Sequence, residues 1–115
     1  MVAAHLVLAG WRFYERDQLD HARAVFFEAT CINYGQPDAY LGLGHSYVRL
    51  GDFDRAIEAY SQPIKVLLGN HEGPIRRVIA EALNSRGLVY EEQGKFDLAR
   101  ADFVAAKKLG ATRQL

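Results

Sequence analysis

The chain has 115 residues, half of them apolar and 24% charged, which suffices for one globular core and is too short for two ordinary domains. Its 14 basic and 14 acidic side chains cancel, so no net charge attracts nucleic acid or an anionic membrane over long range. The single cysteine, Cys31, excludes an internal disulfide, and we expect it to be a small buried residue. No apolar stretch approaches the roughly 20 residues of a membrane span, and the N-terminal residues lack a signal-peptide pattern, so we expect a cytoplasmic protein.

Apolar periodicity and turn residues predict six helices, in chain order near 3–16, 20–33, 37–50, 53–68, 74–93 and 96–109. Short polar turns at Asp17-Gln18, Gly51-Asp52 and Gly94-Lys95 join these helices in pairs. Each pair is therefore expected to be an αα-hairpin, and no strand is expected.

The three helix pairs share one sequence motif. The first contains Leu6-x2-Ala9-Gly10-x2-Phe13 and then Ala22-x3-Phe26; the second, 34 residues later, contains Tyr40-x2-Leu43-Gly44-x2-Tyr47 and Ala56-x3-Tyr60. The third contains Leu83-x2-Arg86-Gly87-x2-Tyr90 and Ala99-x3-Phe103, with the same spacing of 12 from glycine to alanine. A glycine inside a helix costs about 1 kcal/mol in helix propensity, so three glycines in phase predict close contacts between paired helices.

The second and third copies are separated by 43 residues, because about nine extra residues lie near 71–79. Pro74 suits the first position of a helix, and an apolar stripe follows it. We therefore expect the fifth helix to begin about two turns early. Pro63 predicts a bend in the fourth helix, while His71 and Glu72 are too few ligands for a metal site.

These copies resemble the tetratricopeptide repeat family, although the first lacks the leading aromatic residue and the third has Arg86 where leucine is expected. The resemblance implies an all-α fold: a right-handed superhelix of three helix-turn-helix pairs with an elongated fifth helix. It implies one domain over residues 1–115, with repeats at about 3–36, 37–70 and 80–113 and the insertion at about 71–79.

The resemblance also implies a concave groove lined by the first helix of each pair. The expected lining is Val7, Leu8, Trp11, Tyr14, Leu41, His45, Val48, Arg49, Asn84, Leu88 and Glu91, together with Glu81, Ser85 and Glu92. Trp11 fits either the groove or the core. The carboxylate clamp of chaperone-binding members is absent, since its lysine, asparagine and arginine positions hold other residues. An apolar groove with an acidic end is expected to accept an apolar or amphipathic segment that carries Lys or Arg at one end.

The sequence thus predicts a protein-interaction module, an adaptor or small chaperone with a protein or peptide client. One alternative is a structural subunit that self-associates or docks in a larger complex, and another is similarity to class II chaperones of type III secretion translocators. No catalytic arrangement stands out, so neither enzymatic activity nor a cofactor, nucleic acid or membrane partner is expected. Leu98, Val104 and Ala105 are expected to stay exposed on the last helix, which makes homodimerisation a further hypothesis.

Overall fold

The computed structural model describes residues 2–32, 37–66 and 73–109. These residues form six helices: α1 (Val2–Glu15), α2 (Leu19–Ile32), α3 (Pro37–Arg49), α4 (Phe53–Val66), α5 (Gly73–Glu92) and α6 (Phe96–Lys108). All bounds lie within two residues of the predicted ones, and the described ranges contain no strand. The predicted all-α fold is confirmed. His71, Glu72 and the tail from residue 110 lie outside the described residues.

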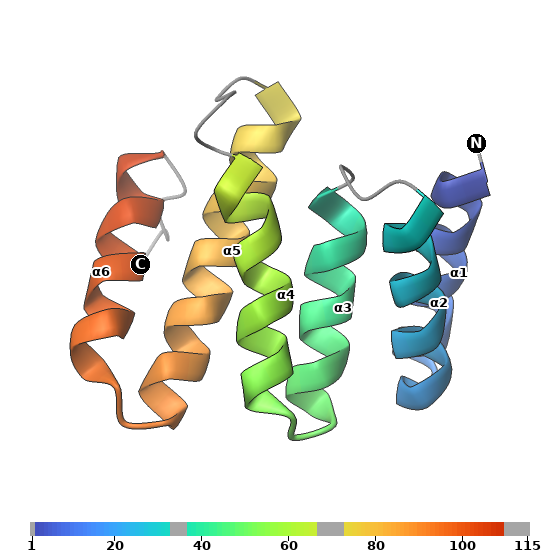
Figure 1. Ribbon diagram of the computed structural model, residues 1–115, viewed down its shortest axis with the longest axis horizontal. Helices are drawn as coiled ribbons and strands as arrows, with labels where there is room; N and C mark the ends of the chain where they lie inside the picture. The colour runs from blue at the N-terminus through green and yellow to red at the C-terminus, as the bar shows by residue number, and fades with distance from the viewer. Residues whose placement is uncertain (1, 33–36, 67–72, 110–115) are drawn as a thin grey trace.

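The helices stand side by side in chain order, and the three hairpin turns lie at the same end of the molecule (Figure 1). All three turns have the same backbone conformation. Each places one residue in the left-handed region, namely Asp17 (φ 61°), Gly51 (φ 82°) and Gly94 (φ 79°). The next residue donates its N–H to a carbonyl five positions back, as from Asp52 to Tyr47. This is the Schellman ending of a helix, which glycine favours because it has no Cβ.

The three phased glycines make the predicted close contacts between paired helices, and the structure shows that each contact is with an aromatic ring. A Cβ at Gly10 would lie 2.6 Å from the Phe26 ring, and one at Gly87 would lie 2.6 Å from the Phe103 ring. A Cβ at Gly44 would overlap the Tyr60 ring in the same way. Each aromatic residue comes from the second helix of the same pair, so the glycine and the ring fix how the two helices nest.

The first helices of the pairs form an inner layer. Helix α1 packs against α3, and α3 packs against α5, while no comparable contact joins α2 to α4 or α4 to α6 among the described residues. Such unequal spacing curves the array so that α1, α3 and α5 lie on the concave side.

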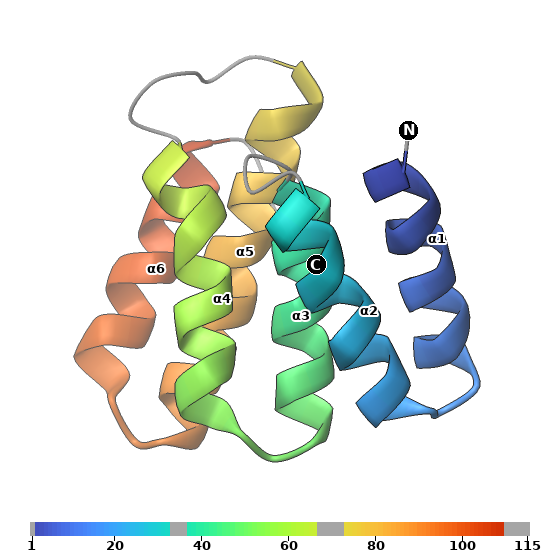
Figure 2. The ribbon, with the colours of Figure 1, turned by 45° about the vertical axis from the view of Figure 1, so that its right-hand side comes forward.

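Helix α5 is the longest helix and rises past its neighbours in both ribbon views (Figures 1 and 2). The predicted early start is confirmed. Its first turns carry Arg76, whose Nε donates to the carbonyl of Leu109, 3.1 Å away, beyond the end of α6. Helix α4 continues through the buried Pro63 to Val66, and the bend at Pro63 stays a prediction.

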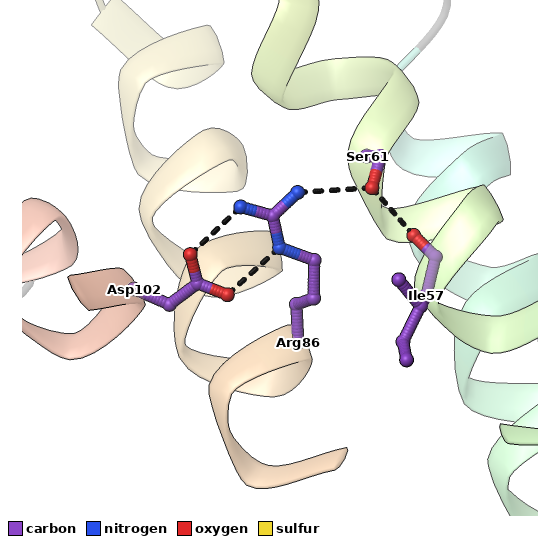
Figure 3. A network of polar contacts seen from close by, with 4 residues as sticks. All are labelled: Ile57, Ser61, Arg86 and Asp102. Atoms are coloured by element: carbon purple, nitrogen blue, oxygen red, sulfur yellow. Dashed lines mark hydrogen bonds and ion pairs between the residues drawn. The ribbon is translucent and has the colours of Figure 1, made fainter. Parts of the chain in front are cut away.

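A polar network replaces apolar packing between α4, α5 and α6 (Figure 3). Arg86 donates two hydrogen bonds of 2.7 Å to the Asp102 carboxylate and a third, of 2.9 Å, to Ser61 Oγ. Ser61 donates in turn to the carbonyl of Ile57. The Asp102 side chain is only 7% exposed, so its charge is stabilised by the bidentate arginine.

Two predictions about exposure have different outcomes. Leu98 and Val104 are each 49% exposed, as expected, whereas Ala105 is partly buried because it packs against the cluster that contains Ile79 and Leu83. Cys31, expected to be buried, is exposed, because it lies in the last turn of α2, where the helix has passed the core residues Phe26 and Ala29.

Candidate peptide-binding groove

A hollow of about 680 Å³ lies over the inner helices, near the end that carries the hairpin turns. We call it the groove. Three inner helices contribute Tyr14, His45, Val48, Ser85, Leu88, Val89, Glu91 and Glu92, and the outer helices contribute Phe53, Tyr60 and Phe96. It therefore spans all three repeats.

The wall that α5 and α6 provide contains exposed apolar side chains. Leu88 is 52% exposed and Phe96 is 65% exposed, although both are large apolar residues. Large apolar groups that gather in a concave surface, with polar groups at its edge, are typical of ligand sites.

The floor of the groove is polar and links three helices. The Tyr60 hydroxyl of α4 lies 2.5 Å from His45 Nδ1 of α3, and His45 Nε2 lies 3.7 Å from a carboxylate oxygen of Glu81 of α5. If the hydroxyl donates to Nδ1, the ring proton sits on Nε2 and faces Glu81. The three side chains then form one continuous polar chain.

Burial and hydrogen bonding change the acidity of both ends of this chain. Burial raises the pKa of Tyr60 well above its ordinary value, and the negative charge that Tyr14 acquires on ionisation raises it further, while a hydrogen bond with Ser85 opposes this. The hydrogen bond from His45 lowers the pKa of Glu81. Tyr60 is therefore neutral and Glu81 is a carboxylate at neutral pH.

The edge of the groove is acidic. Glu91 and Glu92 are exposed on the last turn of α5, and the lining contains no Lys or Arg. Arg49, which follows the lining residue Val48, lies over the Tyr14 ring at 5.0 Å and pairs with Asp17 at 2.5 Å. Its charge is thus offset by a carboxylate outside the groove.

The structure brings together seven of the predicted lining residues, namely Tyr14, His45, Val48, Ser85, Leu88, Glu91 and Glu92, whereas Glu81 does not line the groove. Val7 and Leu41 are instead buried in the core, because their positions on the helices face neighbouring helices; the expected lining is corrected there. Leu8 is 51% exposed but does not line the groove, and neither do Arg49 and Asn84.

Trp11 lies between the core and the groove. Its ring packs edge-on against buried Phe26 at 5.0 Å, and against Tyr14 and His45 at 5.5 and 5.9 Å. Trp11 is partly buried and does not line the groove itself. It supports two residues that do.

Four lining residues were not predicted: Phe53, Tyr60, Val89 and Phe96. The groove was expected to be lined by the first helix of each pair alone, whereas three of these residues come from second helices. A signal existed for two of them, since Phe53 and Phe96 both stand two residues after the turn glycine, in Gly51-Asp-Phe and Gly94-Lys-Phe.

Within residues 2–32, 37–66 and 73–109 there is neither a cluster of metal ligands nor a membrane-spanning helix. No group of three or more His, Cys, Asp or Glu side chains there could hold a metal ion. None of the helices in these ranges has the length and apolar character needed to cross a membrane.

A family model described as tetratricopeptide repeat matches residues 7–62 and 41–113. No curated protein matches the sequence. Among solved structures, a crystal structure of MamA is 30% identical, with a TM-score of 0.82 over 94% of this chain and 58% of that chain. The present chain thus spans little more than half of the MamA chain.

Two further structures contain a bound peptide or binding region. The type III secretion chaperone SycD of Yersinia enterocolitica, in complex with a peptide of the translocator YopD, is 19% identical, with a TM-score of 0.80 over 96% of this chain and 77% of that one. PcrH in complex with the chaperone binding region of PopB is 21% identical, with a TM-score of 0.80 over 97% and 83%. At these identities the similarity concerns the fold.

Proposed function

The chain belongs to the tetratricopeptide repeat family, and on that premise we propose that it is a protein-interaction module. Its groove binds an amphipathic segment of a client protein, with apolar side chains against Leu88 and Phe96 and a basic residue beside Glu91 and Glu92. The protein acts as an adaptor or small chaperone and has no catalytic role.

One observation carries the proposal: half-exposed Leu88 and Phe96 share a hollow with two exposed carboxylates and with no cation. Covering apolar surface yields about 25 cal/mol per Å², so a segment that buries both side chains gains affinity. The carboxylates then favour Lys or Arg at that end of the segment and disfavour acidic segments.

The two complexes described above support this function by analogy, because both proteins share the fold, and SycD holds a peptide of the translocator YopD while PcrH holds the chaperone binding region of PopB. The analogy concerns the way of binding and not the client.

Tryptophan fluorescence offers a direct test, because Trp11 is the only tryptophan and touches two groove residues, Tyr14 and His45. A tryptophan-free peptide with leucine anchors and lysines at one end should shift its emission as it binds. Replacing Leu88 by alanine should weaken binding about fivefold, since roughly 1 kcal/mol of apolar burial is lost.

Leu8→Ala is the matched control, because Leu8 is exposed to the same extent as Leu88 but lies outside the groove. The control should bind like the unaltered protein. Equal losses in both variants, or no response of Trp11 to any such peptide, would contradict the proposal.

A further inference from the structure

One side of α6 has no helix packed against it among the described residues, whereas the equivalent side of α4 packs against α5. Helix α4 packs between α3 and α5, whereas α6 packs only against α5 within the described part of the chain. On α4 the side that meets α5 carries Phe53, Ile57 and Ile64, which pack against core residues of α5 such as Val89 and Ile79. The fold thus shows which side of α6 lacks a helix.

Charged residues occupy this side of α6. The positions equivalent to Phe53, Ile57 and Ile64, each 43 residues later, hold Phe96, Arg100 and Lys107. Arg100 and Lys107 are exposed, and neither side chain makes a hydrogen bond or ion pair with the residues described. Val104, on the same helix face, is 49% exposed. We call this surface the α6 face. It consists of the exposed apolar residues Phe96 and Val104, each followed along the helix by a cation, Arg100 after Phe96 and Lys107 after Val104.

We propose that the α6 face binds an amphipathic helix of a partner protein that carries carboxylates on both sides of its apolar stripe. The partner helix takes the place that α5 has on α4. Its apolar side chains cover Phe96 and Val104, and its carboxylates meet Arg100 and Lys107. This surface shares Phe96 with the acidic groove but extends away from it along α6 to Val104 and Lys107, and its cations select the opposite charge.

Charge also explains why the occupant is not a second copy stacked end to end. In such a stack α1 of the next copy would lie on the α6 face, as α5 lies on α4. The α1 positions equivalent to Ala82 and Val89, 77 residues earlier, hold His5 and Arg12. Both are exposed, and Arg12 would bring positive charge towards Arg100 and Lys107. Like charges facing each other oppose this contact.

The test uses the full chain and two fluorescein-labelled helical peptides of about 20 residues, one with glutamates beside a leucine stripe and one with lysines in their place. Fluorescence anisotropy should show that the glutamate peptide binds. The double variant Arg100→Glu/Lys107→Glu should bind it at least about tenfold more weakly, because two attractions become repulsions. These exposed residues are not needed for folding.

The matched control is Arg12→Glu/Arg16→Glu, which changes the net charge equally at exposed positions in the last turn of α1 and directly after it, and it should bind the glutamate peptide within about twofold of the unaltered protein. The proposal is overturned if the glutamate peptide does not bind, or if both double variants lose affinity equally. It is also overturned if sedimentation shows self-association that Arg100→Glu/Lys107→Glu abolishes, since a second copy would then be the occupant.

Discussion

Three glycines at the centres of inner helices each lie under the ring of an aromatic residue from the paired helix. Gly44 under Tyr60 is a tightly enclosed pair, because Tyr60 is 1% exposed and its hydroxyl is held by His45. The ring therefore has little room to move. The glycine makes this contact possible at a propensity cost of about 1 kcal/mol.

Gly44→Ala tests whether packing outweighs propensity. On an exposed helix this change would stabilise the protein by about 1 kcal/mol. Here the added Cβ overlaps the Tyr60 ring, and overpacking of this kind costs about 1–3 kcal/mol. We expect a net loss of about 1–2 kcal/mol in urea unfolding. A variant more stable than the unaltered protein would contradict this account of the repeat.

Because of the Tyr60 hydroxyl, the free energy of unfolding should depend on pH in the alkaline range. Its pKa is raised in the folded protein, mainly by burial, so the neutral phenol is favoured there while the unfolded chain ionises near its ordinary pKa of 10.0. The contribution is fully present below that pH and is lost as pH rises above it.

Tyr60→Phe should separate this contribution from the ionisation of other groups. At neutral pH the variant should be less stable by about 0.5–1.5 kcal/mol, because His45 loses its phenol partner. Between pH 8 and about 11 its stability in urea should fall less than that of the unaltered protein. If the stability of the two proteins falls equally with pH, Tyr60 is not the group whose ionisation destabilises the folded protein.

At the scale of helices, two equivalent junctions are built from different chemistry. The junction of α2, α3 and α4 contains Phe27, Leu43 and Ala59, which contribute to the lining of a hollow of about 220 Å³. Between α4, α5 and α6 the equivalent residues are Ser61, Arg86 and Asp102, which hydrogen-bond to one another (Figure 3). The hydrogen bonds to Asp102 also raise the pKa of Arg86.

A double-mutant cycle tests this junction by returning it to the residues of the middle repeat. Asp102→Ala alone should cost about 3 kcal/mol, because it leaves the largely buried Arg86 without its carboxylate. Arg86→Leu/Asp102→Ala should restore much of the loss, and Ser61 stays satisfied by the Ile57 carbonyl. Urea unfolding should give a coupling energy of about 2 kcal/mol. Additive losses would show that the pair does not act as a unit.

The helices and turns could be predicted from the sequence because their determinants are local. The glycine positions, the hairpin turns and Pro74 each act over one or two turns of helix. The early start of α5 followed from the changed repeat spacing, from Pro74 and from the apolar stripe that follows it.

The polar contacts could not be predicted, because they join residues that only the folded chain brings together. Asp102 resembles an ordinary helix-surface charge in the sequence, yet it is buried against Arg86. His45 has no sequence relation to Glu81, 36 residues away, but the two face each other across α3 and α5. The groove was predicted in part, since first-helix residues follow the repeat and Phe53 and Phe96 enter from the second helices.

At the scale of the molecule, the array presents two surfaces of opposite charge preference. The groove has apolar walls and an acidic edge, while the α6 face has an apolar strip and two cations. Basic and acidic segments are thus expected at different places on the same chain.

Amide chemical-shift mapping tests the central claim most directly. Adding the lysine-ended, leucine-anchored peptide to ¹⁵N-labelled protein should shift amides around His45, Val48 and Leu88 to Phe96, in the last turns of α3 and α5. Amides of α2 should stay unchanged. Shifts confined to α2 and the outer side of α4, or no shifts at all, would contradict peptide binding in the groove.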